Sequence, residues 1–96
     1  EALTYKADAV LELGEPQWAA NLCHLALESD PDNGHAFYQL ACAHTAMNQL
    51  DDAVHFLQQA INRSDTYREQ CLSDPALSEL QSYPGLEKVL NPLTES

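Results

Sequence analysis

The sequence repeats itself with a period of 34 residues. A shift by this period places apolar side chains on others of similar kind, in the pairs Ala7 and Ala41, Ala19 and Ala53, Ala26 and Ala60, Leu3 and Phe37, Leu22 and Phe56, and Leu27 and Ile61. Gly14 falls on Asn48, and both residue types tolerate the left-handed conformation that ends a helix. A period near 34 is typical of arrays of helical hairpins, in which each hairpin buries its apolar face against the next.

Apolar spacing within the repeat predicts amphipathic helices. From Phe37 the apolar positions follow the i, i+3, i+4, i+7 spacing of one helix face, and the same rhythm returns between Leu50 and Ile61. The side chains that we expect to be used in packing are Leu3, Ala7 and Val10 in the first helix and Phe37, Leu40, Ala41 and His44 in the third.

The acidic stretch from Asp30 to Gly34 allows two interpretations, a calcium loop or a hinge between helices. A calcium loop that begins at Asp30 needs glycine at its sixth position and glutamate at its twelfth, where this chain has His35 and Ala41. A start at Glu28 fails in the same way. The proline, acids, asparagine and glycine of this stretch instead stop one helix and begin the next, so the sequence predicts a hinge.

Composition limits the class of protein. With 96 residues and 45% apolar content, the chain can bury one modest core. Its formal charge of −11 repels phosphate backbones and anionic lipid heads, so we expect neither nucleic acid nor a membrane as partner. There is no apolar run long enough to span a bilayer, and we expect a cytoplasmic chain. The helical rhythm is already present at residue 1, which suggests a piece of a longer protein.

Metal and catalytic sites find little support in the residue spacing. The cysteines Cys23, Cys42 and Cys71 are odd in number and widely spaced, which favours reduced thiols in the core over a disulfide framework or a zinc site. Cys42 and His44 are two residues apart and face different directions on a helix. No nucleophile elbow, phosphate loop or paired-carboxylate motif occurs. We therefore expect no metal, no cofactor and no enzymatic activity.

Several residues of the second unit stand at the positions that are characteristic of a known repeat family. Phe37 near its start, Leu40 before the small Ala41, and then Ala53 and Ala60 stand in the register of the tetratricopeptide repeat family, which residues 1 to about 65 resemble. The first unit matches at Ala7, Gly14, Ala19, Ala26 and Pro31, and departures occur at Lys6, Val10, His44 and Asp65. The resemblance implies an all-α fold of tandem antiparallel helical hairpins in a right-handed solenoid, with repeat one at 1–33 and repeat two at 34–65.

Residues 66–96 resemble the short helices that close such arrays. Thr66 and Glu69 form a candidate capping box, and proline follows both Asp74 and Tyr83, where a short helix can begin. The apolar positions Leu86, Val89, Leu90 and Leu93 again follow helical spacing. Because an exposed apolar stripe of this size is costly, we expect these capping helices to pack on repeat two rather than to form a linker.

The resemblance implies a protein-interaction scaffold that holds a peptide or partner helix on the concave surface made by the first helix of each hairpin. The alternative is an accessory, regulatory or self-assembly module of a larger enzyme or complex. Self-assembly through the ends of the array would give a homo-oligomer. Helix geometry places the candidate partner-binding residues on one inward stripe: Thr4, Asp8, Leu11, Glu12, His35, Tyr38, Cys42 and Thr45.

This stripe could equally be an ordinary solvated helix face. If it binds a partner, Tyr38 is the expected aromatic anchor. Asp8 and Glu12 make the surface negative, so we expect a protein or peptide partner that is basic or neutral. Relatives that grip the free carboxylate of chaperone tails do so with lysine and asparagine. The matching positions here are Thr4, Asp8, Cys42, Leu72 and Ala76, which supply neither, so an acidic chaperone tail should not bind.

Overall fold

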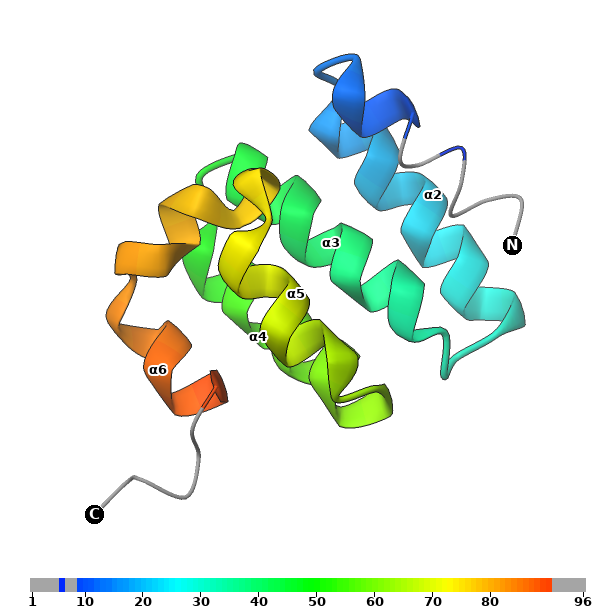
Figure 1. The fold of residues 1–96 in the computed structure, drawn as a ribbon. Coiled ribbons are helices and arrows are strands. Elements are labelled where there is room, and N and C mark those ends of the chain that lie inside the picture. The colour runs from blue at the N-terminus through cyan, green and yellow to red at the C-terminus, as the bar shows by residue number, and fades with distance from the viewer. Residues whose placement is uncertain (1–5, 7–8, 91–96) are drawn as a thin grey trace.

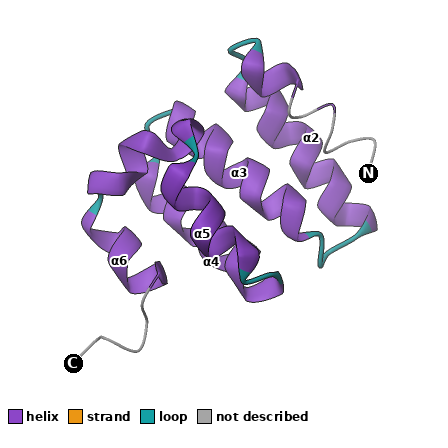
Figure 2. Cartoon of the chain, in the orientation of Figure 1, coloured by secondary structure: helices purple, strands orange, loops and turns teal. Residues whose placement is uncertain are grey.

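The fold is built from helices packed side by side (Figure 1). The computed structural model describes residue 6 and residues 9–90. A helical segment ends at residue 12 and is followed by α2 (Pro16–Ser29), α3 (Gly34–Ala46), α4 (Leu50–Arg63), α5 (Thr66–Ser73), the 3-10 helix η1 (Pro75–Ser82) and α6 (Pro84–Leu90). No strand occurs in this part of the chain, which confirms the expected all-α fold (Figure 2).

The turn inside each hairpin recurs with the 34-residue period. Gly14 and Asn48 both have positive φ, of 85° and 61°, as their equivalence predicted. Their hydrogen bonds also repeat, because the N–H of Gly14 donates to Leu11 and that of Asn48 to Thr45, each over 3.0 Å. The next N–H in each turn reaches back five residues. Each turn therefore satisfies the carbonyl groups left over at the end of a helix in the same way.

The stretch between α2 and α3 is a hinge, as predicted. The N–H of Asn33 donates to the Asp30 carbonyl over 3.1 Å, which closes a tight turn. The side chain of Asn33 then accepts from the N–H of Ala36 over 3.1 Å, so this residue is the N-cap of α3. Capping of this kind satisfies one of the free N–H groups at the start of a helix.

Small side chains bring the long helices close together. Fully buried alanines on α2, α3 and α4 include those at the repeated positions, Ala19, Ala26, Ala41, Ala53 and Ala60. The predicted packing positions Val10 and Leu40 are buried among them, whereas Leu3 and Ala7 lie outside the described residues. Phe37 and His44 are only half-buried and stack on Phe56, with ring centroids 6.4 and 5.1 Å away.

His44 differs in one respect from a fully hydrogen-bonded core histidine. Its Nδ1 lies 2.7 Å from Gln49 Oε1, but its Nε2 is buried without a hydrogen-bonding partner among the described residues.

The C-terminal segment, defined here as α5, η1 and α6, packs on the second hairpin as expected. Its buried side chains are Cys71, Leu77, Leu80, Leu86 and Val89. They join the core of α3 and α4, with η1 against α3 and α6 against α4. Leu90 is half-buried at the edge of this core, and Leu93 lies outside the described residues.

Two of the three predicted helix starts in this segment are confirmed. Asp74 caps η1 by accepting from the N–H of Ala76 over 2.9 Å, and Pro84 begins α6. The capping box at Thr66 and Glu69 is wrong. Asp65 is the N-cap of α5 and makes no capping hydrogen bond, while the Thr66 hydroxyl lies 2.9 Å from that of Ser64. Because Thr66 is already the first helical residue, its side chain cannot act as the cap.

Polar side chains tie the segment together internally. Gln81 Nε2 donates to the Cys71 carbonyl over 2.7 Å, and the Arg68 guanidinium donates to the carbonyl groups of Val89 and Leu90 at the end of α6. All three cysteines are buried and remain thiols. None of the described helices is both long and apolar enough to cross a bilayer.

Candidate functional site

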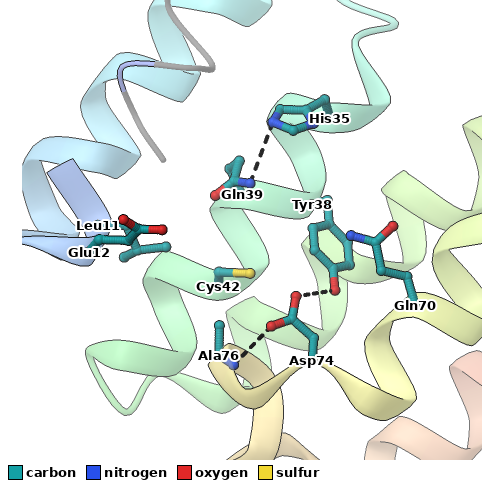
Figure 3. A pocket seen from close by; sticks show the side chains of 9 residues that line it. All are labelled: Leu11, Glu12, His35, Tyr38, Gln39, Cys42, Gln70, Asp74 and Ala76. Carbon is teal, nitrogen blue, oxygen red and sulfur yellow. Dashed lines mark hydrogen bonds between the residues drawn. The ribbon is translucent and has the colours of Figure 1, made fainter. Parts of the chain in front are cut away.

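A groove of about 530 Å³ lies where the first hairpin, α3 and the C-terminal segment meet (Figure 3). Its lining residues are Leu11, Glu12, His35, Tyr38, Gln39, Cys42, Gln70, Asp74 and Ala76. Three parts of the chain that are distant in sequence therefore form one concave surface. Five of the eight predicted site residues line it: Leu11, Glu12, His35, Tyr38 and Cys42.

Of the other three predicted residues, Thr45 is the one that the structure describes. Thr45 is 2% exposed, and its hydroxyl donates to the carbonyl of Ala41 over 2.8 Å. It is therefore a core residue of α3, and its place on an exposed stripe is wrong. Thr4 and Asp8 lie outside the described residues.

Tyr38 is a wall of the groove and not the exposed anchor that was expected. The side chain is 2% exposed, and its ring stacks on Tyr67 of α5 with centroids 4.9 Å apart. The phenol donates a hydrogen bond of 2.6 Å to Asp74 Oδ2. Burial, and then this hydrogen bond, raise the pKa of Tyr38 above its usual value, so the hydroxyl stays protonated. The prediction failed because α5 and η1 cover this face of α3. Cys42 is buried for the same reason.

Polar groups line much of the open part of the groove. Gln39 is 7% exposed, and its Nε2 lies 3.4 Å from Nε2 of His35, one helical turn away. Gln70 approaches from α5 and is exposed. Figure 3 shows Asp74 between Tyr38 and Ala76, held by a hydrogen bond to each. The arrangement offers several hydrogen-bond acceptors beside the apolar side chain of Leu11.

The charges that line the groove are negative. Glu12 and Asp74 are acidic, His35 is the one lining imidazole, and neither lysine nor arginine is among the described lining residues. The positions compared above with carboxylate-gripping relatives fit this picture, since Cys42 and Ala76 face the groove without supplying a cation. In the described residues, no group of three histidine, cysteine or acidic side chains is placed to hold a metal ion.

Four residues that line the groove were not among the site residues predicted from the sequence. Gln39 could have been found, because it follows His35 by four residues and precedes Cys42 by three, on the same helix face. Ala76 follows Cys42 by one 34-residue period but was considered only for chaperone tails. Asp74 was recognised only as a helix start. For Gln70 no local signal existed, because its role depends on how α5 packs against α3.

Comparison with known proteins identifies this architecture. A family model described as tetratricopeptide repeat matches residues 10–81. The match continues beyond residue 65, where the resemblance read from the sequence ended, and includes α5 and most of η1. No curated protein matches the chain.

Proposed function

The chain belongs to the tetratricopeptide repeat family, whose repeats generally mediate protein–protein interactions, and we propose that it binds a peptide or a partner helix in the groove beside α3. The observation that carries this proposal is the convergence of the first hairpin, α3 and the C-terminal segment on one concave surface. Concave surfaces with an apolar part and a few fixed polar groups are typical binding sites.

The groove offers contacts of two kinds. Leu11 provides an apolar surface, and the side-chain amides of Gln39 and Gln70 provide donors and acceptors for the backbone of a bound segment. Glu12 and Asp74, together with the formal charge of −11, favour a basic or neutral partner. Attraction of this kind mainly raises the association rate and weakens with salt. An association rate that does not fall between low and physiological salt would contradict the electrostatic part of the proposal.

A substitution that fills the groove tests the site. Ala76 lines the groove and is exposed, so Ala76→Trp should block it while leaving the core unchanged. Ser78 is exposed on the same element but does not line the groove, and Ser78→Trp adds the same side chain there. We expect capture of partners from a lysate of the source cells to be lost with Ala76→Trp and retained with Ser78→Trp. Equal capture by both variants would contradict a partner in this groove.

Two further features of the proposal follow from the family and the thiols. Family members are typically non-catalytic interaction modules, and we propose no enzymatic activity for this chain. Three buried thiols that form no disulfide agree with a reducing compartment, which supports the cytoplasm as its location.

Self-association is a second candidate, favoured by one observation. Trp18 and Leu25 lie two helical turns apart on α2 and are 47% and 48% exposed. Large apolar side chains that share one exposed helix face often mark an interface. Sedimentation velocity at rising protein concentration would reveal a dimer, and Trp18→Gln should abolish it.

A further inference from the structure

We infer that the groove binds the guanidinium group of an arginine side chain in the partner. This inference rests on the proposed function and adds the chemistry that the groove would recognise. It follows from three acceptor groups, on Glu12, Asp74 and Gln39, which come from three different parts of the chain.

Asp74 is an acceptor whose position is already fixed. Its Oδ2 accepts from the Tyr38 hydroxyl over 2.6 Å, and its Oδ1 accepts from the Ala76 N–H over 2.9 Å. A carboxylate oxygen can accept two hydrogen bonds, so each oxygen keeps capacity for a donor from a ligand. Because the two existing bonds hold the carboxylate in place, a ligand does not have to bear the cost of ordering it.

Gln39 supplies a second acceptor in the wall of the groove. The side chain is more than nine-tenths buried, and Nε2, at one end of its amide, lies 3.4 Å from His35. At the other end of the amide is the carbonyl oxygen Oε1, which is an acceptor with two lone pairs. Because Gln39 lines the groove, this oxygen can accept a hydrogen bond from a donor of a ligand there.

Glu12 completes the set from the opposite side of the groove. Figure 3 shows it with Leu11 across from Gln39 and Asp74. Its side chain is exposed, so it can adjust to a ligand, whereas Gln39 and Asp74 are fixed by their neighbours.

Arginine fits this set better than lysine. A guanidinium group presents five N–H donors in a plane and can bond several separated acceptors at once, whereas an ammonium group has three donors on one atom. It is also more weakly hydrated, so it loses less on entering a half-enclosed groove. A carboxylate would face Glu12 and Asp74 without a lining lysine or arginine to pair with, among the described residues.

The test compares three blocked pentapeptides, Ac-Ala-Gly-Xaa-Gly-Ala-NH2, in which Xaa is arginine, lysine or the neutral arginine isostere citrulline. They are titrated into the ¹⁵N-labelled chain and followed by its amide resonances. We expect the arginine peptide to shift the amides of Glu12, Gln39 and Ala76. We expect citrulline to bind at least about fivefold more weakly, because charged hydrogen bonds are roughly twice as strong as neutral ones, with lysine intermediate.

Two variants with the same change of charge separate a local site from the general field. Glu12→Gln removes a proposed acceptor charge and should weaken the arginine peptide at least about threefold. Glu28→Gln removes the same charge from an exposed position on α2 that does not line the groove, and it should leave the affinity unchanged.

Equal binding of the arginine and citrulline peptides would overturn the inference, as would equal weakening by the two variants. Absence of shifts with all three peptides would overturn it too. None of these results decides the proposed function, which depends on the capture experiment with Ala76→Trp and Ser78→Trp.

Discussion

The second hairpin and the C-terminal segment form one core but are stabilised differently. In the hairpin, α3 and α4 have 13 and 14 residues, and fully buried alanines such as Ala41, Ala53 and Ala60 let the two backbones approach closely. The C-terminal segment consists of pieces of seven or eight residues, which insert large side chains such as Leu77 and Leu80 into that core. Isolated helices shorter than about 12 residues are marginal in water, so the segment depends on the hairpin for its structure.

Both of these regions contribute to the groove, together with Leu11 and Glu12 of the first hairpin. Gln39 belongs to the second hairpin, whereas Gln70, Asp74 and Ala76 belong to the C-terminal segment. The site is therefore complete only while the C-terminal segment is packed against the hairpin. Substitutions in the two regions should consequently differ in how much of the molecule they affect.

The largest effect is expected in the hairpin. Leu57 on α4 is fully buried between α3 and the C-terminal segment, so Leu57→Ala leaves a cavity in the shared core. We expect the free energy of unfolding to fall by about 2–5 kcal/mol. Urea denaturation followed by circular dichroism measures this change, and hydrogen exchange should quicken in all the long helices. Exchange that quickened only in residues 66–90 would contradict a shared core.

The matching change in the C-terminal segment should act locally. Leu80 in η1 is also fully buried, and Leu80→Ala removes the same number of atoms. We expect a loss of about 2–3 kcal/mol, seen as faster amide exchange in residues 66–90, while α3 and α4 keep most of their protection. If Leu80→Ala exposed α3 and α4 as fully as Leu57→Ala does, the two regions would be one cooperative unit and the comparison would fail.

A smaller effect is expected at the hydrogen bond that joins the regions. Tyr38→Phe removes the donor to Asp74 and keeps the ring that stacks on Tyr67. We expect a loss of about 1–2 kcal/mol, concentrated in the exchange of the C-terminal segment. Tyr67→Phe is the control, because the Tyr67 hydroxyl makes no hydrogen bond within the described residues, and it should change stability by less than about 0.5 kcal/mol. Equal losses in both variants would show that the bond to Asp74 does not join the regions.

The smallest effect is expected in alkaline solution, above pH about 10. Burial raises the pKa of Tyr67, and burial with the Asp74 hydrogen bond raises the pKa of Tyr38. Above pH about 10 the unfolded chain releases these protons while the folded chain keeps them, so the free energy of unfolding falls as the pH rises. We expect a loss below about 1 kcal/mol per tyrosine at pH 10.5. Urea denaturation of Tyr38→Phe should show a shallower decline, and an unchanged slope would contradict this assignment.

Features set by neighbouring residues could be predicted from the sequence. Gly14 and Asn48 marked the turns because a helix commonly ends on a residue with positive φ, and Asp74 marked the start of η1 because a proline follows it. The exposure of Tyr38 could not be predicted in this way. Helical periodicity assigned it correctly to a second face of α3, but only the packing of α5 and η1 on that face decides that it is buried.

The same reason explains what was missed in the groove. Leu11, Glu12 and His35 could be predicted because they follow from the geometry of helices that the repeat already fixed. Gln70 and Asp74 could not, because their distance in sequence says nothing of where the C-terminal segment will pack. The family match to residue 81 gives the reason in retrospect, since α5 and η1 continue the repeat across α3.

The three buried thiols can report when the helices that cover them move apart. Cys23 lies in α2, Cys42 in α3 and Cys71 in α5, so one is present in the first hairpin, one in the second and one in the C-terminal segment. A buried thiol reacts with an alkylating reagent only after the helix that covers it has moved away. The order in which the three sites are labelled under native conditions therefore gives the order in which the three units separate, with Cys71 expected first.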